Sequence, residues 1–493
     1  MSHLKAYQAD HVDRVLEIFK TSHFAIDTSI TGSGKTHASL ALAQSLGVSV
    51  FVVCEATAKH TWRDVQEEFF PDVKIQDLMS YHLFRGVKNL VSHGYFEYND
   101  DEVVLLHKFK KLVRRKGVML IFDEAHGLRN PSKQTKISYF LSKYIREDFK
   151  RGGKSRVLFL SATPFNKEIN ACNVLRALGL HDGKPLVKGV PFYDNEPLVQ
   201  LRRRLRAIDD EGYNKVVHFP APTAAEAKRE VYQMFNQIIK KKCSSTMLSR
   251  DKRDKLEYGV KHTKMNIVVK PHTEEESLSY KEGINMIKLL RVKKDGRALT
   301  NVARMTQIAK IAMLCKLARE ELTINPSCKV ILFTDYVEYC GQSIAKNLHD
   351  LNPLYLHGKV DHEERGEIIK KFNAPDLESR VLIATSSVGG SSISLHDTDG
   401  RFPRAMFILP SHHGIQMAQC MGRHCRNGVN SDCKTYIVFG PSPVELTFYE
   451  TYWLTSSVIN DTSGNYFGVQ RNVRSVADFH EGKSYNIKDL YRI

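Results

Sequence analysis

Two adjacent carboxylates, Asp123 and Glu124, close an apolar run at residues 118–122. The run is too short for a helix and is typical of a buried parallel strand. At the carboxyl end of such a strand, the first carboxylate can hold Mg²⁺ through water, and the second can orient and deprotonate an attacking water. The alternative is a helix N-terminus with Asp123 as its cap, and these residues alone do not decide between the two.

A phosphate-binding pattern lies nearer the start of the chain, where the sequence SITGSGKT spans residues 29–36. It follows a short apolar run at 24–26 and precedes a predicted helix at 37–46, which is the context that this motif requires. Backbone N–H groups of the loop and the helix N-terminus can cradle phosphates. The residues expected to bind nucleotide are Thr31, Gly32, Ser33, Gly34, Lys35 and Thr36, with the Thr36 hydroxyl also offered to Mg²⁺. Ser29 replaces the first glycine of the motif, and an ordinary glycine-rich turn is the alternative.

Polar residues at both ends of the chain can complete such a site. Gln8 lies upstream of the loop, where its amide could hydrogen-bond an adenine edge, although it could also simply begin an N-terminal helix. Gln419, Arg423 and Arg426 lie far downstream. Helical spacing predicts that the two arginines face the same way, as a transferring γ-phosphate requires. Two solvent-facing arginines on a basic helix are the alternative.

Apolar runs that alternate with helical patterns predict an α/β fold in two halves. Strands are expected in the first half at 24–26, 48–53, 118–122 and 156–160, and in the second half at 329–335, 381–385 and 405–409. Basic runs at 202–204 and 240–242 lie between the halves, within helical periodicity. We therefore predict one lobe at 1–185, a basic helical insertion and linker at 186–273, a second lobe at 274–445 and a C-terminal tail at 446–493.

Composition limits the class of protein. The 493 residues are 42% hydrophobic, which supports full globular cores, and the formal charge of +17 favours a polyanionic partner, most often nucleic acid, over a basic enzyme without one. The nine cysteines form no CxxC pair, so reduced thiols are expected rather than a zinc site. No apolar run reaches the roughly 18 residues that span a bilayer, and the first residues have no signal-peptide pattern. An intracellular protein without membrane contact is expected.

Taken in order, these motifs resemble the superfamily 2 helicases and translocases. Details resemble the Snf-type branch, namely Tyr7-Gln8, the DEAHGLRN sequence at 123–130 and Thr163-Pro164. The phosphate loop and Ser161-Ala162-Thr163 depart from that branch toward a general helicase pattern. The compact layout is also similar to helicase-type ATPases of large cytoplasmic DNA viruses, so a viral, cytoplasmic or nuclear setting is expected.

The resemblance implies two RecA-like parallel-sheet lobes with ATP between them. Gln8 would contact adenine, Asp123 would hold Mg²⁺ and Glu124 would be the base. Gln419, Arg423 and Arg426 would complete the site, with Arg426 as the arginine finger, and His126 would link hydrolysis to the lobe interface.

The function implied is a nucleic-acid-dependent ATPase that translocates on or unwinds nucleic acid. DNA is favoured, and proteins of transcription or replication are expected as partners. Alternatives are a DEAH-type RNA helicase, a non-catalytic nucleic-acid-binding scaffold, and a P-loop metabolite kinase. The kinase would leave residues 274–440 unexplained.

Overall fold

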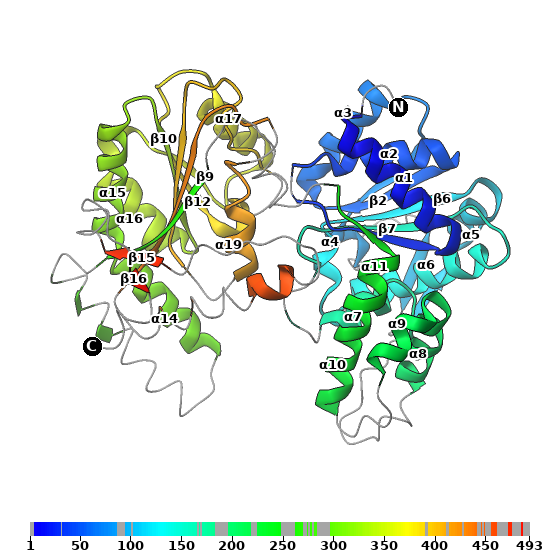
Figure 1. Cartoon of the computed structure of the whole chain (residues 1–493). Helices are drawn as coiled ribbons and strands as arrows, with labels where there is room; N and C mark the ends of the chain where they lie inside the picture. Colours follow the sequence, from blue (N-terminus) through cyan, green and yellow to red (C-terminus); the bar gives the residue numbers. More distant parts are fainter. Residues whose placement is uncertain are drawn as a thin grey trace. The chain divides into compact units, whose positions relative to one another are not determined.

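The computed structural model describes most of the chain: residues 4–30, 32–85, 94–99, 102–164, 167, 170–182, 196–217, 224–247, 262–269, 274, 277–278, 281–282, 296–389, 393–410, 414–425, 428–440, 445, 448, 455–460, 472–475 and 485–486. Two of the residues expected at the site, Thr31 and Arg426, lie outside the described residues. The chain divides into two compact units, residues 1–253 with 458–466, and residues 254–457 with 467–493. Each unit is built on its own sheet (Figure 1).

The sheet of the first unit is parallel, with the order β3-β2-β6-β7-β1-β8 in its described residues. Its strands are β1 (Phe24–Asp27), β2 (Ser49–Cys54), β3 (Ile75–Ser80), β6 (Val118–Asp123), β7 (Arg156–Leu160) and β8 (Ser244–Ser245). A separate antiparallel hairpin pairs β4 (Phe96–Asn99) with β5 (Glu102–Leu105). The strands predicted from the apolar runs of this half are confirmed within one or two residues.

Helices cover both faces of this sheet, because successive strand residues point to opposite sides. Phe51, Val53, Leu120 and Phe122 pack into the core beneath α5, α6 and α7, whereas Val50, Val52, Met119 and Ile121 pack beneath α1, α2 and α3. The helices are α1 (Ala6–Thr21), α2 (Lys35–Leu46), η1 (Ala56–Ala58), α3 (Lys59–Phe69), α4 (Tyr81–Phe84), α5 (His107–Lys111), η2 (Leu112–Lys116), η3 (Ala125–Leu128), α6 (Lys133–Phe149) and α7 (Asn170–Ala177).

The basic region after α7 is helical and belongs to the first unit. It contains α8 (Glu196–Ile208), α9 (Asp210–Val216), α10 (Ala224–Met234), η5 (Phe235–Ile239) and α11 (Lys240–Lys242). Its apolar residues, such as Leu201, Leu205 and Phe235, join the core under α6 and α7. A buried pair holds two of its helices together, because Arg202 donates to Glu230 at 2.8 and 2.7 Å. The short strand β8 then returns the chain to the edge of the sheet beside β1.

The second unit has a longer sheet of order β11-β12-β10-β13-β14-β9-β15-β16 in its described residues. Its strands are β9 (His262–Val268), β10 (Lys329–Thr334), β11 (Leu354–Leu356), β12 (Val381–Thr385), β13 (Arg404–Ile408), β14 (Cys433–Phe439), β15 (Asn472–Ser475) and β16 (Tyr485–Asn486). All neighbours are parallel except β15 and β16. Strand β9 comes from the range predicted as linker, and β15 and β16 come from the range predicted as tail.

The helices of the second unit are α14 (Gly296–Ile308), α15 (Ile311–Ile324), η6 (Val337–Gly341), α16 (Gln342–Asn347), η7 (His349–Leu351), α17 (His362–Asn373), α18 (Ser386–Gly389) and α19 (Gly414–Cys420). Apolar residues of α15 and α16 pack on Val330, Leu332 and Ile383 of the sheet. The two α/β units confirm the expected fold class of tandem RecA-like lobes. None of the nine cysteines, all of which are among the described residues, forms a disulfide bond. Among the described residues, no helix is both long and apolar enough to span a membrane.

Candidate nucleotide site

The phosphate loop connects β1 to α2 at the carboxyl edge of the first sheet, where open α/β sheets bind ligands. Gly34 precedes α2 with φ +91°, a conformation that side-chain-bearing residues rarely adopt. The ammonium of Lys35 donates to the carbonyls of Ser29 at 3.0 Å and Ile30 at 3.2 Å. The loop is therefore curled around a cation, with the N-terminus of α2 beside it, which fits an anionic phosphate chain.

Gln8 closes this loop from α1. Its side-chain oxygen accepts from the backbone N–H of Lys5 at 2.9 Å, and its side-chain nitrogen donates to the carbonyl of Ser33 at 3.1 Å. The hydroxyl of Tyr7 donates to the same carbonyl at 3.4 Å. Gln8 is 5% exposed, so the structure places it against the phosphate loop. Its expected role toward adenine stays a prediction.

The acidic pair lies at the end of β6, two strands from the loop in the sheet order. The desolvated surroundings of Asp123 and the charge of Glu124 raise the pKa of Asp123 to about 6, against the opposing effects of Trp62 and Lys35. Lys35 follows the loop after β1 and Asp123 ends β6, so both lie at the carboxyl edge of the same parallel sheet. Asp123 is not a helix cap, because it ends the strand and Glu124 precedes the short helix η3.

Glu124 adopts a left-handed backbone conformation with φ +54°. For a residue with a side chain this costs of the order of 1 kcal/mol, and such outliers gather at functional sites. Its Oε2 lies 3.1 Å from Nδ1 of His126, so the next polar residue of the motif restrains the carboxylate. Glu55, which directly follows β2, has a pKa that burial raises. The charge of His126 opposes that rise, and the charge of Glu124 adds to it.

Trp62 contacts the acidic pair, and the sequence pattern around it does not predict this contact. Its side chain is fully buried on α3. Its indole N–H also donates to Asp123 Oδ2 at 3.0 Å, so α3 orients the carboxylate expected to hold Mg²⁺. A tryptophan on the apolar face of a helix gives no separate signal for that hydrogen bond.

A buried ion pair beneath the loop was also missed. His11 Nε2 lies 3.2 Å from Asp27 Oδ2, and Asp27 Oδ1 accepts the backbone N–H of Ser29 at 2.8 Å. Burial alone would raise the pKa of Asp27, but the neighbouring His11 and Lys35 lower it below its ordinary value. Ser29, in place of the usual glycine, accepts the backbone N–H of Met247 at 2.8 Å through its hydroxyl. The end of the basic helical region is thereby attached to the phosphate loop.

The candidate residues of the second unit lie on helix α19 and directly after it. Gln419 lies on this helix, which ends at Cys420, and Arg423 lies beyond its end. The prediction that Arg423 sits on a helix is therefore wrong. Its carbonyl accepts the N–H of Leu395 at 2.9 Å, a contact with a distant segment that an α-helical continuation would not allow. The Arg423 side chain is 1% exposed, which also argues against a solvent-facing arginine.

His424 anchors this segment to the sheet. Its Nε2 lies 3.1 Å from the carbonyl oxygen of Lys434 and 3.2 Å from the hydroxyl of Thr435, both on β14. The same hydroxyl lies 2.9 Å from Nε2 of His262 on β9, and the two histidine rings pack edge to face at 5.3 Å. Cys433 donates through its thiol to the carbonyl of His424 at 3.3 Å. Nothing in the sequence spacing pairs His262 with His424.

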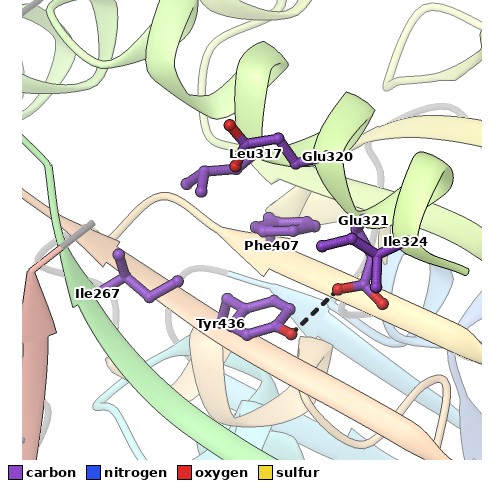
Figure 2. Close-up of a pocket in the computed structure, with 7 residues that line it drawn as sticks. All are labelled: Ile267, Leu317, Glu320, Glu321, Ile324, Phe407 and Tyr436. Atoms are coloured by element: carbon purple, nitrogen blue, oxygen red, sulfur yellow. Dashed lines mark hydrogen bonds between the residues drawn. The ribbon is translucent and has the colours of Figure 1, made fainter. Parts of the chain in front are cut away.

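A hollow in the second unit lies away from all of these motifs. Figure 2 shows that it is bordered by Ile267, Leu317, Glu320, Glu321, Ile324, Phe407 and Tyr436. The hydroxyl of Tyr436 donates to Glu321 at 3.2 Å, and Lys434 donates to the other oxygen of that carboxylate at 2.7 Å. Its carboxylate is already engaged within the protein, so the hollow offers no comparable set of groups for a nucleotide. In the described part of the chain, no group of three or more His, Cys, Asp or Glu residues could hold a metal ion by itself.

Each half of the chain matches a known protein family. Residues 1–166 match the family described as Type III restriction enzyme, res subunit, and residues 309–428 match the Helicase conserved C-terminal domain. The first match contains the phosphate loop and the acidic pair, and the second contains Gln419 and Arg423. The chain belongs to the superfamily 2 helicases and translocases. This superfamily 2 enzyme is accordingly an ATP hydrolase.

Two relatives and one solved structure are similar to the chain. The enzyme is 22% identical over 457 residues to "Putative ATP-dependent RNA helicase L364" of Acanthamoeba polyphaga mimivirus, covering 86% of this chain and 77% of the relative. It is 24% identical over 322 residues to the SNF2 domain-containing protein CLASSY 3 of Arabidopsis thaliana, covering 59% of this chain but only 21% of that protein. A solved Sulfolobus solfataricus SWI2/SNF2 ATPase core in complex with dsDNA aligns over 88% of both chains, with 15% identity and a TM-score of 0.32.

Proposed function

We propose that this enzyme is a nucleic-acid-stimulated ATPase that uses Mg²⁺-ATP to move along DNA. The observation that supports the hydrolytic part most directly is the position of Lys35, Asp123 and Glu124 at the carboxyl edge of one parallel sheet. A cation, a carboxylate that can hold a metal ion and a restrained second carboxylate are the groups that hydrolysis of a nucleoside triphosphate needs.

The donor chemistry of the phosphate loop fits the phosphates of ATP and a hard divalent cation. Backbone N–H groups at the start of α2 and the Lys35 ammonium would bind phosphate oxygens, together with Gly32, Ser33 and Gly34. The Thr36 hydroxyl and the Asp123 carboxylate are oxygen donors of the kind that Mg²⁺ prefers. Bound Mg²⁺ would supply neutralisation of the phosphate charge, and Trp62 would keep Asp123 oriented toward it.

Glu124 is the residue we assign as general base. Its carboxylate would accept a proton from the attacking water, and His126 at 3.1 Å would hold it in place. The strained backbone at Glu124 supports this assignment, because a positive φ aims the side chain away from the direction that a continuing strand would give it. Gln419, Arg423 and Arg426 would complete the site from the second unit, Arg426 as the arginine finger.

Nucleic acid is the partner that the charge favours. A formal charge of +17 would attract a polyphosphate backbone strongly. We favour DNA over RNA because residues 123–130 have the Snf-type pattern. We also propose proteins of transcription or replication as partners. Similarity to a mimivirus protein also supports an origin in a large DNA virus. The genes that flank its coding sequence would test that origin.

An RNA helicase is the second candidate. It is favoured by the broad coverage of a relative that is named an RNA helicase, and by the general helicase pattern at Ser161-Ala162-Thr163. The decisive measurement is ATP turnover with single-stranded DNA, duplex DNA, single-stranded RNA and duplex RNA in parallel. Stimulation by duplex DNA above the other three supports the translocase, and stimulation by RNA alone would replace it with the helicase. Turnover unchanged by all four would contradict both.

A further inference from the structure

The first unit carries a basic face at the amino ends of β6 and β7, the edge of the sheet away from the phosphate loop. Residues 107–117, which lead into β6, contain six Lys or Arg and no Asp or Glu. Residues 150–156 lead from α6 into β7. The exposed cations of these two segments are Lys108, Lys110, Lys111, Arg114, Arg115, Lys116, Lys150, Arg151 and Lys154. We call this set the amino-edge basic face.

The two segments lie side by side although they are distant in sequence. The hydroxyl of Ser155 donates to the carbonyl of Val113 at 3.1 Å and accepts the N–H of Val118 at 3.1 Å. A Cβ placed on Gly117 would come within 3.2 Å of the Cβ of Lys154. The end of η2 and the turn before β7 are therefore adjacent. Figure 1 shows the helices α5 and α6 that flank these segments in the chain.

Neighbouring carboxylates neutralise only part of this face. Glu147 is already bonded to Arg146 at 2.9 Å and to Lys150 at 3.4 Å. Asp148 lies among Arg114, Arg151 and Arg156, and burial raises its pKa, which those three arginines oppose. In the described part of the chain, no carboxylate lies at ion-pair distance from Arg115, Lys116, Arg151 or Lys154. Their charges remain available to an external anion.

The cations stand on a rigid base. Phe109, Leu112 and Val113 are buried in the core of the first unit, which fixes α5 and η2 from below. The guanidinium of Arg114 lies over Tyr144 at 5.6 Å, and that of Arg156 lies over Phe149 at 4.5 Å. A backbone that is already fixed loses less freedom on binding than a mobile segment.

We propose that the amino-edge basic face binds backbone phosphates of duplex DNA, as a contact region separate from the nucleotide edge of the same unit. The six residues of β6 hold the two edges about 17 Å apart. Phosphate contacts carry no sequence information, so this face would increase affinity without choosing a sequence. The inference rests on the proposed function only for the identity of the polyanion.

The test compares two quadruple variants of the full chain with the wild type. One is Arg115→Gln/Lys116→Gln/Arg151→Gln/Lys154→Gln. The matched control removes the same charge from exposed lysines of the second unit, Lys316→Gln/Lys346→Gln/Lys370→Gln/Lys371→Gln. Affinity for a labelled 40-base-pair duplex is measured without nucleotide at several salt concentrations, together with melting temperature and nucleic-acid-free ATP turnover.

Each phosphate contact contributes about 0.9 to the slope of log affinity against log salt. We expect the amino-edge variant to lose about 2 to 4 from that slope and at least tenfold in affinity at low salt, with melting temperature and basal turnover kept. The control variant should lose clearly less. Equal losses of affinity in both variants would mean that only the net charge of the protein matters, and would overturn the proposal.

Three other results would also overturn it, and they are distinguishable. A wild type that binds no duplex would mean that the proposed function has failed. A wild type that binds duplex while the amino-edge variant binds equally well would mean that this face alone has been misassigned. Poly-glutamate is also tested as a competitor of duplex binding. If the amino-edge variant keeps its affinity for the duplex but no longer binds poly-glutamate, the partner of this face is an acidic protein rather than DNA.

Discussion

Gln8 donates a 3.1 Å hydrogen bond from its side-chain nitrogen to the carbonyl of Ser33, and this contact passes directly over Gly34. A Cβ on Gly34 would come within 2.0 Å of that nitrogen. The first helix of the unit and the phosphate loop are thus fitted to each other at a position where only glycine leaves room. Two separate constraints meet at Gly34, because its φ is also +91°.

We predict that Gly34→Ala weakens nucleotide binding at least tenfold. The positive φ alone costs about 1–3 kcal/mol for alanine, and the clash with Gln8 adds to it. Titration of a fluorescent ATP analogue measures the loss. In a Gln8→Ala background the same change meets no clash but keeps the backbone strain, so the fold loss that Gly34→Ala causes relative to its own parent should be smaller there. No loss of affinity in that background would show that backbone conformation is unimportant here.

Lys35→Ala and Glu124→Gln are expected to abolish hydrolysis by different routes. Lys35 would bind phosphate, so its loss should weaken ATP binding as well as turnover. Glu124 would act on the attacking water, so its amide variant should still bind ATP while turnover falls by at least 10²-fold. Parallel measurements of affinity and single-turnover rate separate the two. Wild-type turnover in Glu124→Gln would remove that carboxylate from the mechanism.

Strands β1, β2, β6, β7, β10, β12 and β13 could be predicted because they are buried on two sides, so their sequences are short apolar runs bounded by polar residues. Strand β14 was missed, since Lys434 and Thr435 interrupt its apolar pattern even though it is central to the second sheet. Strand β8 was missed because two serines have no strand signal, and its place depends on pairing with β1. Pairing between strands that are distant in sequence depends on the tertiary structure, so the local sequence does not predict it.

The candidate residues of the first unit could be named because their motifs are local in sequence. Their supporting contacts could not, since each joins residues far apart in the chain. Trp62 and Asp123 are separated by 61 positions, and His11 and Ser245 by 234. The prediction from helical spacing that Arg423 lies on a helix was wrong, because the carbonyl of Arg423 accepts a hydrogen bond from the N–H of Leu395 and the helix does not continue.

His424 is expected to position the arginine segment. We predict that His424→Leu lowers the maximal turnover by about 10–100-fold with little change in apparent ATP affinity, since a displacement of about 1 Å has that effect on catalysis. His424→Gln, which can still donate to the carbonyl of Lys434, should recover most of the rate. Turnover is measured per folded molecule, with nucleic acid saturating.

Thr435→Val is the matched control for this network. It removes the hydroxyl that lies between His424 and His262 while keeping the shape of the side chain. An intermediate loss of turnover is expected. If both His424 variants lower only the melting temperature and leave turnover per folded molecule intact, the histidine serves stability alone.

Stability of the first unit should fall in mild acid because of His23. This side chain is buried and lies 3.0 Å from the carbonyl of Leu178, and burial lowers its pKa from 6.5 to about 3. Between those two values the unfolded chain binds a proton that the folded chain does not, so the free energy of unfolding decreases as pH falls through this window. One such group changes it by at most about 1.4 kcal/mol per pH unit.

The measurement is urea unfolding at pH 7.5, 6.0 and 5.0 in a Trp453→Phe background, which leaves Trp62 as the remaining tryptophan. His23→Gln keeps a donor for Leu178 but cannot titrate, so its stability should depend less on pH than that of the parent. His181, whose pKa burial lowers to about 4, leaves a residual dependence of the same sign. An unchanged slope in His23→Gln would mean that His23 is not the group responsible.

Arg426→Ala is expected to leave ATP binding nearly intact and to remove most hydrolysis. An arginine finger stabilises charge that develops in the transition state, and its loss costs roughly 10³–10⁵ in rate. Arg423→Ala is the comparison, because that side chain is 1% exposed and its truncation should lower the melting temperature as well. Nucleotide affinity, melting temperature and nucleic-acid-stimulated turnover are measured on one preparation of each variant. Normal turnover in Arg426→Ala, with turnover lost in Arg423→Ala beyond what its stability explains, would transfer the finger to Arg423.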